Sequence, residues 1–300
     1  MNQTHHFQSL SPLGKQYWSS TIGKSPPSVD YEAVIGSEDA VLEWLENVHR
    51  YGFCLVNGVP VDPKLTEELI RRIAFIRETH YGGFWEFSPD LAHGDTAYTD
   101  MALKAHTDTT YFTDPCGLQI FHLLSHTEGS GGESLLVDGF RAASILQEKH
   151  PEDFEILMRT RVPTHAVGDA LYKYTVIGEG YPIITTRGGE PSMIRYNNDD
   201  RSVIKHMAPE DVAPWYVYGA LASWDRVLSS PDSEYWFQLQ PGTVVVIDNH
   251  RVLHGRAEFT GKRRLCGAYV GKDDYLARLY ALRDRAVAKE GESSVWDPTL

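Results

Sequence analysis

The first regular pattern along the chain has helical spacing. Ser37 is a good N-cap residue and Gly52 a good stop signal, and the apolar residues between them recur every three or four positions. This stripe consists of Val41, Leu42, Leu45 and Val48. The spacing predicts an amphipathic helix, and the apolar run at 53–56, directly after Gly52, predicts a short buried strand.

A second helical stripe follows Asp62-Pro63, where an N-cap residue precedes a proline at the first helical position. Its predicted buried face consists of Leu65, Leu69, Ile70, Ile73 and Ile76. We expect the end of this helix to deliver two aromatic side chains, Tyr81 and Trp85.

Beyond Gly117 the pattern changes to short apolar runs that are separated by Gly and Asp turns, which is typical of strands. Predicted strands cover 118–124, 134–137, 193–196, 243–247 and 265–270, and predicted helices cover 140–149, 151–158, 209–228 and 273–285. The strands are too irregularly spaced for alternating βα units, and we find no Gly-rich phosphate-binding turn. The fold is therefore predicted to be mainly β with flanking helices, built on a double-stranded β-helix, the cupin-like jelly roll.

The two ends of the chain differ in character from its centre. Residues 1–28 are polar and interrupted by prolines, which predicts an arm or a poorly ordered terminus. Residues 29–300 are long enough for one large β domain. The first twenty residues resemble neither a secretory signal nor a transit peptide, and no apolar window is long enough to span a bilayer. We therefore expect a cytoplasmic protein.

Charge and cysteine content narrow the classes of partner and site. The formal net charge is -13, which argues against nucleic-acid binding because such a surface needs clustered Lys and Arg. Cys54, Cys116 and Cys266 are odd in number and far apart, so they predict neither a disulfide framework nor a cysteine-rich zinc site. The expected partner is a small molecule, with no nucleic acid and no membrane.

Two distant segments carry the candidate chemistry. His106 and Asp108 are two residues apart and would project from the same face of a strand. His254 follows the apolar run 243–247, which predicts a buried strand leading into a turn. Two histidines and one carboxylate, with the opposite positions open, form the facial triad of non-haem Fe(II) oxygenases. A surface histidine beside a turn aspartate is the alternative, because His-x-Asp is a common sequence.

Four segments, at 77–87, 94–99, 106–112 and 248–256, match one known family in order and in residue type. They include His-Thr-Asp-Thr-Thr-Tyr-Phe at 106–112 and Arg-Val-Leu-His-Gly-Arg within the last segment. The chain resembles the trimethyllysine dioxygenases and, more broadly, the gamma-butyrobetaine dioxygenases. The resemblance implies that 29–300 is a catalytic jelly-roll domain that uses Fe(II), 2-oxoglutarate and O2, and it allows ascorbate as a reductant. It also implies that the catalytic iron ligands are His106, Asp108 and His254.

Strand alternation offers a separate indication of the residue that holds the cosubstrate. Arg263 and Tyr269 fall on one face of the predicted strand and would look into one cavity, about 20 Å apart at about 3.3 Å per residue. A planar guanidinium matches a carboxylate through two parallel hydrogen bonds. We therefore assign the distal carboxylate of 2-oxoglutarate to Arg263, with Arg256 and Arg264 as alternatives.

Aromatic residues indicate the class of substrate. A quaternary ammonium group cannot donate a hydrogen bond, so proteins hold it by the faces of aromatic rings. The positions that form such a cage in the resembling family are Tyr81, Trp85, Tyr98 and Tyr269. Rings this frequent are also ordinary core residues, so the cage depends on the resemblance.

Three polar residues complete the expected substrate site. Asp95 matches an acidic position of the trimethyllysine branch, where the butyrobetaine enzymes carry an amide, although Asp is also common in turns. Asn197 and Asn198 resemble the amides that hold the substrate carboxylate, and a turn at the end of a strand is the alternative. Which of the two asparagines reaches the ligand stays open at this point.

These expectations combine into one function, the hydroxylation of N6,N6,N6-trimethyllysine at C3, as in carnitine biosynthesis. The alternatives are the same chemistry on gamma-butyrobetaine or on another amino acid or betaine of specialised metabolism, and a non-catalytic jelly-roll protein that binds a cation. The N-terminal zinc-binding module of the family, which is associated with dimers, is not recognisable in this sequence. A homodimer is therefore an open expectation.

Overall fold

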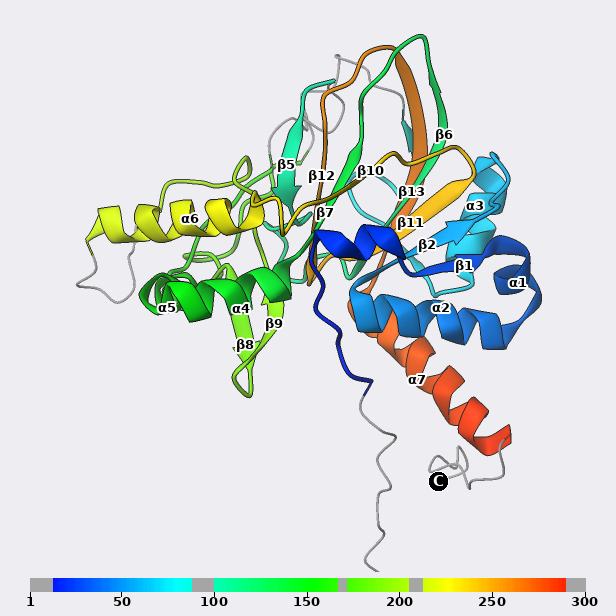
Figure 1. Ribbon diagram of the computed structural model, residues 1–300, viewed down its shortest axis with the longest axis horizontal. Helices are drawn as coiled ribbons and strands as arrows, with labels where there is room; N and C mark the ends of the chain where they lie inside the picture. Colours follow the sequence, from blue (N-terminus) through cyan, green and yellow to red (C-terminus); the bar gives the residue numbers. More distant parts are fainter. Residues whose placement is uncertain (1–12, 88–99, 167–171, 205–212, 290–300) are drawn as a thin grey trace, which may run out of the picture.

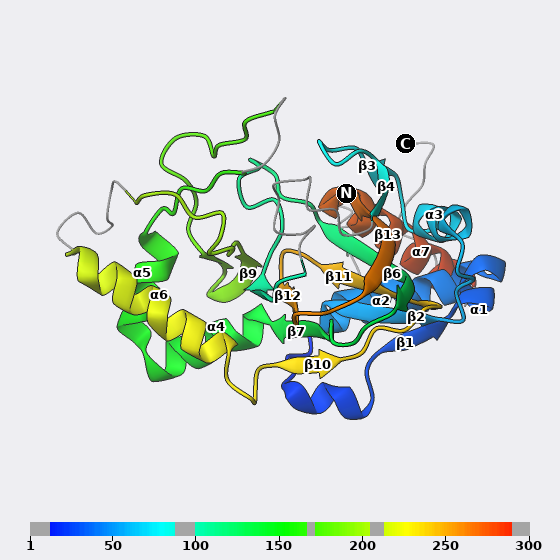
Figure 2. The same ribbon diagram turned by 90° about the horizontal axis from the view of Figure 1, so that it is seen from above.

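The computed structural model describes residues 13–87, 100–166, 172–204 and 213–289, and in these ranges the chain folds into two β-sheets with helices on their outer sides (Figure 1, Figure 2). The larger sheet has seven strands. Its order is β1 (Ser28–Asp30), β2 (Phe53–Asn57), β11 (Thr243–Asp248), β6 (Leu118–Thr127), β13 (Lys262–Val270) and β3 (Ile76–Arg77), with β4 (Phe84–Phe87) also paired to β13. Only β1 and β2 pair in parallel; the other pairs are antiparallel.

The smaller sheet has four strands. Its order is β10 (Tyr235–Phe237), β7 (Ser134–Asp138), β12 (Val252–Arg256) and β5 (Leu103–His106). A separate hairpin consists of β8 (Ile184–Arg187) and β9 (Glu190–Ile194). Side chains from the larger and the smaller sheet pack into one buried cluster, which includes Leu136 of β7 together with Val245 and Ile247 of β11. The two sheets therefore face each other, and the predicted jelly roll with flanking helices is confirmed.

Two further cores lie on the outer faces of the sheets. The larger sheet is covered by α1 (Tyr31–Gly36), α2 (Glu38–Tyr51), α3 (Pro63–Arg71) and α7 (Lys272–Lys289). The smaller sheet is covered by α4 (Gly139–Lys149), α5 (Pro151–Arg159) and α6 (Pro214–Leu228). Helices thus cover the outer face of each sheet, and the inner faces of the two sheets oppose each other. A ligand cavity can lie between these inner faces.

Local capping explains why the starts of the first two predicted helices, and the end of the first, were placed correctly. The Ser37 side chain accepts a hydrogen bond from the Asp39 N–H at 3.2 Å, and Gly52 ends α2 in the left-handed conformation with φ 79°. Asp62 likewise accepts from the Lys64 N–H at 2.7 Å, with proline at the first turn of α3. Each signal satisfies backbone groups that a helix end leaves unpaired.

The expectation that α3 delivers Tyr81 and Trp85 was wrong. The helix ends at Arg71. After it the backbone hydrogen bonds span three residues instead of four, as in the bond from the Ile73 N–H to the Ile70 carbonyl. Trp85 lies instead on β4, and Tyr81 lies in the loop before it. The apolar period misled because Ile73 faces the same core as the helix without belonging to it.

The N-terminal segment also differs from the prediction where the structure describes it. From Leu13 onward it packs against the fold and includes a short 3-10 helix, η1 (Ser20–Lys24). Trp18 is buried, and its ring N–H donates to the Tyr51 carbonyl at 2.6 Å while its backbone N–H donates to Asp138 at 3.1 Å. Other contacts of this segment are backbone hydrogen bonds, such as that from the Gln16 N–H to the Arg50 carbonyl, which composition alone does not reveal.

The remaining boundaries shifted by a few residues. The predicted strand 193–196 ends at Ile194, and the predicted helix 209–228 begins at Pro214, its earlier residues lying largely outside the described ranges. Among the described residues, no helix combines the length and the apolar character that crossing a membrane requires.

Candidate functional site

His106 and His254 come together because their strands pair. His106 is the last residue of β5 and His254 lies on β12, where the two are direct cross-strand partners. Their rings lie 4.3 Å apart between centroids. The predicted turn lies earlier, at 249–251, so His254 occupies the strand that follows it.

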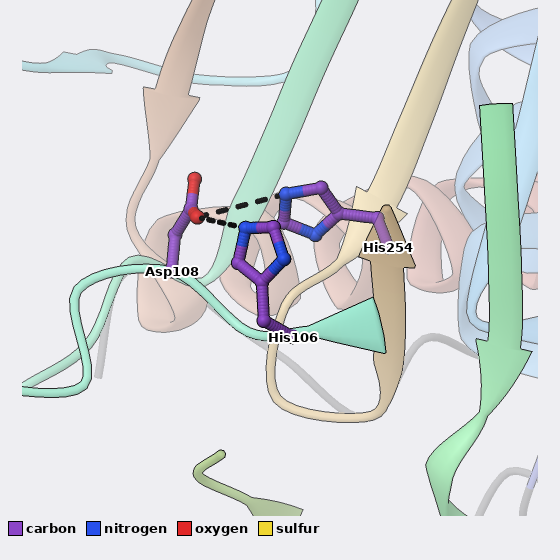
Figure 3. Close-up of side chains that lie close together, drawn as sticks. All are labelled: His106, Asp108 and His254. Carbon is purple, nitrogen blue, oxygen red and sulfur yellow. Dashed lines mark ion pairs between the residues drawn. The ribbon is translucent and has the colours of Figure 1, made fainter. Parts of the chain in front are cut away.

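Asp108 reaches the same point from a loop (Figure 3). The expected strand ends at His106, so the two side chains do not share a strand face as predicted. Asp108 Oδ1 nevertheless lies 3.3 Å from His106 Nε2 and 3.6 Å from His254 Nε2. Ligand atoms about 2.0–2.2 Å from a metal ion and at right angles to each other are about 3 Å apart. The donor set and its spacing therefore fit one octahedral metal ion, with half of the positions left for other ligands.

The protonation of Asp108 and His254 suits a cation. Burial alone would raise the pKa of Asp108, but the neighbouring His254 and His106 hold it well below its usual range. Burial and the nearby His106 lower the pKa of His254 to about 3, so this imidazole is neutral at pH 7. Asp108 is thus a carboxylate and His254 a free base, which are the forms that ligate metal ions.

A backbone contact fixes which nitrogen of His106 faces the site. Its Nδ1 lies 2.7 Å from the Lys104 carbonyl, and a carbonyl can only accept, so Nδ1 carries the hydrogen. Burial lowers the pKa of His106, but the hydrogen bond and charge of Asp108 raise it overall. In the neutral form that can ligate a metal ion, the lone pair is on Nε2, which faces Asp108 and His254. Orientation of a ligand imidazole by a backbone carbonyl is a common feature of metal sites.

Three residues hold Asp108 in place. Asn249 accepts from the Asp108 backbone N–H at 2.7 Å and donates to its carbonyl at 3.0 Å, so the side-chain amide grips the peptide on both sides. Gln119 Nε2 and the Tyr269 hydroxyl both donate to Asp108 Oδ2, the latter at 2.8 Å. Burial and the charge of Asp108 raise the pKa of Tyr269 well above its usual value, so this hydroxyl remains a donor. Oδ1 is left facing the imidazoles.

The triad lines a cavity of about 410 Å³ between the sheets. Arg263 and Tyr269 both line it, as alternation predicted, although β13 carries an irregularity between Arg264 and Leu265. The lining combines apolar and aromatic side chains with polar and charged groups that could orient a ligand, as in small-molecule sites.

Two buried cations lie in the lining. Arg263 is 3% exposed and Arg256 is 9% exposed, and both guanidinium groups stack on Phe259, at 5.4 and 4.6 Å from the ring centroid. Burial lowers the pKa of Arg263 to about 10, so it remains charged at pH 7. Within the described ranges, Arg263 Nε has no hydrogen-bond partner. Arg264, in contrast, is half exposed and pairs with Glu86, which removes it as a candidate for the cavity.

The structure brings together three of the four expected cage residues. Tyr81, Trp85 and Tyr269 all line the cavity, and the rings of Trp85 and Tyr269 lie 6.3 Å apart, edge to face. Tyr98, like Asp95, lies outside the described residues.

The two asparagines separate in the structure. Asn197 lines the cavity. Asn198 is not in the lining, and its side chain accepts from Arg201 Nε at 3.2 Å. Asp199 and Asp200, which sequence reasoning did not select, line the cavity on the same side.

Sequence reasoning also missed Asn249, Gln119 and Tyr111. Tyr111 lines the cavity beside Tyr81, with 3.5 Å between the two hydroxyl oxygens. Asn249 and Tyr111 both lie inside segments that carry the family resemblance, and that membership was the available signal. Gln119 had none, because an apolar strand surrounds it.

Comparisons with known proteins agree with this site. The family model described as "Taurine catabolism dioxygenase TauD, TfdA family" matches residues 9–269. The chain is 43% identical to the trimethyllysine dioxygenase of Neurospora crassa, covering 87% of this chain and 62% of that protein. It is 42% identical to the trimethyllysine dioxygenase of Meyerozyma guilliermondii, covering 90% of this chain and 68% of that protein.

A more distant relative and a solved structure complete the comparison. Identity to the gamma-butyrobetaine dioxygenase of Homo sapiens is 31%, over 90% of this chain and 70% of that protein. The chain thus spans 62% to 70% of the length of these relatives. The crystal structure of a taurine dioxygenase from Burkholderia xenovorans shares the fold, with a TM-score of 0.55 at 14% identity over 82% of this chain and 88% of that one. The chain belongs to the TauD/TfdA family of dioxygenases, and within it to the group of trimethyllysine and gamma-butyrobetaine dioxygenases.

Proposed function

We propose that this chain is an Fe(II)- and 2-oxoglutarate-dependent dioxygenase that hydroxylates N6,N6,N6-trimethyllysine at C3. The observation that carries the proposal is one cavity lined by a His-Asp-His donor set, a buried arginine and a wall of aromatic rings. Identity above 40% to two trimethyllysine dioxygenases supports the choice of substrate.

In this proposal His106, Asp108 and His254 hold the ferrous ion, and their donor atoms leave the opposite side for the cosubstrate and oxygen. When bound, Fe(II) and 2-oxoglutarate supply the oxygen chemistry, in which O2 is consumed, 2-oxoglutarate becomes succinate and carbon dioxide, and the substrate gains a hydroxyl group. The task of the protein residues is to fix the geometry and to exclude water.

Arg263 is the proposed partner of the distal carboxylate of 2-oxoglutarate. A buried guanidinium without a hydrogen bond at Nε, among the described residues, is energetically costly until an anion pairs with it. Arg256 lies in the same lining and its Nε likewise makes no hydrogen bond to the described residues, but its Nη2 donates to the Met101 carbonyl at 2.8 Å, so one of its donors is already used. The second positive charge attracts the dianion without replacing Arg263 as its main contact.

The proposed substrate contacts that the structure describes all line the one cavity. Tyr81, Trp85 and Tyr269 offer ring faces to the trimethylammonium group, to which the expected Tyr98 and Asp95 would add. Asn197 is the better candidate of the two asparagines for the substrate carboxylate, since it lines the cavity. Holding both ends of an elongated substrate determines which carbon lies nearest the metal.

The acidic residues Asp199 and Asp200 support an amino-acid substrate over gamma-butyrobetaine. Trimethyllysine carries an α-ammonium group beside its carboxylate, whereas gamma-butyrobetaine does not. Two carboxylates in the lining near Asn197 favour the additional positive charge.

A substrate panel with ligand variants tests the proposal. Succinate formation and product mass are measured with trimethyllysine, gamma-butyrobetaine and lysine, for the wild type and for His106→Ala. We expect a product heavier by one oxygen from trimethyllysine, and turnover at background for the variant. His150→Ala, which removes an exposed imidazole at the start of α5, is the matched control and retains activity. Normal hydroxylation by His106→Ala would contradict the metal assignment, and preference for another substrate would contradict the substrate assignment.

Location and assembly stay predictions. The expectation of a cytoplasmic protein stands beside the fact that the matching trimethyllysine dioxygenases of Bos taurus and Homo sapiens are named as mitochondrial. The homodimer and the use of ascorbate are likewise proposed only as features of the group.

A further inference from the structure

Tyr269 on β13 has two different environments. Its ring lines the cavity and packs edge to face against Trp85, at 6.3 Å between centroids. Its hydroxyl donates to Asp108 Oδ2 at 2.8 Å. The side chain is 5% exposed, so neither contact is made at the open surface. One residue therefore touches both the aromatic wall and the carboxylate of the donor set.

The hydroxyl contact restricts the orientation of Asp108. The terminal torsion of an aspartate is broad when its carboxylate is free. Here Oδ2 receives Tyr269 from β13 and Gln119 from β6, two neighbouring strands of the larger sheet. With Oδ2 held by the larger sheet, Oδ1 is presented to the two histidines of the smaller sheet.

This contact spans the two halves of the jelly roll. Both histidines belong to the smaller sheet, and Asp108 lies on a loop that follows it. Tyr269 and Gln119 are fixed in the larger sheet, where β13 and β6 pair at Tyr269 and Gln119 themselves. The two donors are thus direct cross-strand partners, and both donate to the same oxygen atom, Asp108 Oδ2.

We propose that Tyr269, whose ring already belongs to the expected cage, is a positioning residue whose hydroxyl orients Asp108 for metal binding. The ring role and the metal role of Asp108 rest on the proposed function, but the role of the hydroxyl rests on its contact alone. The two roles can be separated because phenylalanine keeps the ring and removes only the hydroxyl.

The test compares Tyr269→Phe with Tyr81→Phe in the full chain. Tyr81 also lines the cavity, but its hydroxyl is 3.5 Å from that of Tyr111 rather than on Asp108. Co(II) binding is measured by visible absorption without O2 or substrate. We expect Tyr269→Phe to weaken Co(II) binding about 10-fold to 100-fold, the usual effect of losing an outer partner of a metal ligand. Tyr81→Phe should bind Co(II) within about twofold of the wild type.

A second measurement tests the ring. Binding of trimethyllysine to the Co(II)-saturated protein is followed by calorimetry. Tyr269→Phe should bind it within about threefold of the wild type, whereas Tyr269→Leu, which removes the ring as well, should lose at least about tenfold. Thermal unfolding without metal, unchanged between wild type and Tyr269→Phe, supports a specific role rather than a folding defect.

Two outcomes would overturn the inference. Unchanged Co(II) affinity in Tyr269→Phe would show that the hydroxyl does not position Asp108. Equal losses in Tyr269→Phe and Tyr81→Phe would show a general effect of cavity hydroxyls instead. Failure of the proposed substrate is distinguishable, because it would abolish trimethyllysine binding in the wild type and leave the Co(II) titrations intact.

Discussion

The donor set is assembled by two regions that work in different ways. The histidines are held by sheet register, since His106 and His254 are paired residues of β5 and β12. Asp108 lies on a loop and is held by side chains, namely Asn249 on its backbone and Gln119 with Tyr269 on its carboxylate. Backbone pairing places the histidines wherever the sheet forms. The carboxylate needs dedicated residues from other elements, so its position can be altered without altering the sheet.

Gly255 gives the sharpest test of whether the pairing of β5 with β12 positions the two histidines. It lies between His254 and the irregular pairing at Arg256. A Cβ atom at this position would lie 2.5 Å from the Leu103 carbonyl oxygen of β5. Because the obstacle is backbone, Gly255→Ala must push β5 away from β12 and separate the two histidines. We expect a loss of unfolding free energy of about 1–3 kcal/mol together with a loss of Co(II) affinity, measured by urea unfolding and absorption titration.

Gly219→Ala is the matched control for this change. Gly219 lies inside α6 with open space where its Cβ would point, so alanine should be neutral or should stabilise by about 0.5–1 kcal/mol. If Gly255→Ala kept both stability and Co(II) affinity, the close approach of β5 to β12 would not be what places the histidines.

Asn249→Ala tests the position of Asp108, which lies on a loop, and should have a different effect. Asn249 is 1% exposed and also donates to the Cys116 carbonyl at 2.9 Å, so some stability is lost with it. The larger effect should fall on Co(II) affinity, by about 10-fold to 100-fold, because the Asp108 peptide loses both of its clamps. Turnover should recover at high Fe(II) concentration, since the histidines remain paired.

Asn57→Ala, which removes an exposed amide at the end of β2, is the control and should change neither quantity. A variant at Asn249 that lost turnover irrecoverably at every Fe(II) concentration would argue against positioning. It would place Asn249 in the framework of the fold instead.

The same division explains what the sequence could and could not predict. Helix α2 was predictable because Ser37 and Gly52 act on neighbouring backbone groups. The resemblance located His106, Asp108 and His254, and alternation placed Arg263 and Tyr269 on one face of β13.

The supporting residues could not be found by local pattern. Asn249 and Asp108 are 141 residues apart in the sequence, so no local pattern connects them. Gln119 is buried inside an apolar strand, and its sequence context does not indicate its partner. A short strand such as β10 depends on its neighbour β7 for pairing, so its sequence alone did not indicate it. Contacts between distant segments set these features, and no spacing rule encodes them.

Another histidine, His122, extends the comparison, because it is fully buried in the larger sheet and both of its ring nitrogens have hydrogen-bond partners. Thr66 Oγ1 donates to the Asp62 carbonyl at 2.8 Å and therefore accepts from His122 Nδ1, 2.7 Å away. The Gly242 N–H donates to His122 Nε2 at 3.3 Å. His122 is thus fixed as a neutral imidazole, and a second proton would face an N–H group.

This arrangement predicts the smallest effect, a pH dependence of stability. Burial lowers the pKa of His122 to about 4, below the value near 6.5 of the unfolded chain. The unfolded chain therefore takes up its proton first, and stability that is complete above pH 6.5 is lost as the pH falls toward 4. From pH 7 to 5.5 the loss should be about 1 kcal/mol. Urea unfolding at both pH values measures this effect. The unfolding free energy of His122→Gln should fall less between pH 7 and 5.5 than that of the wild type, by about 1 kcal/mol, because the other histidines contribute equally to both proteins. Equal losses in the two proteins would mean that His122 is protonated as readily in the folded chain as in the unfolded one.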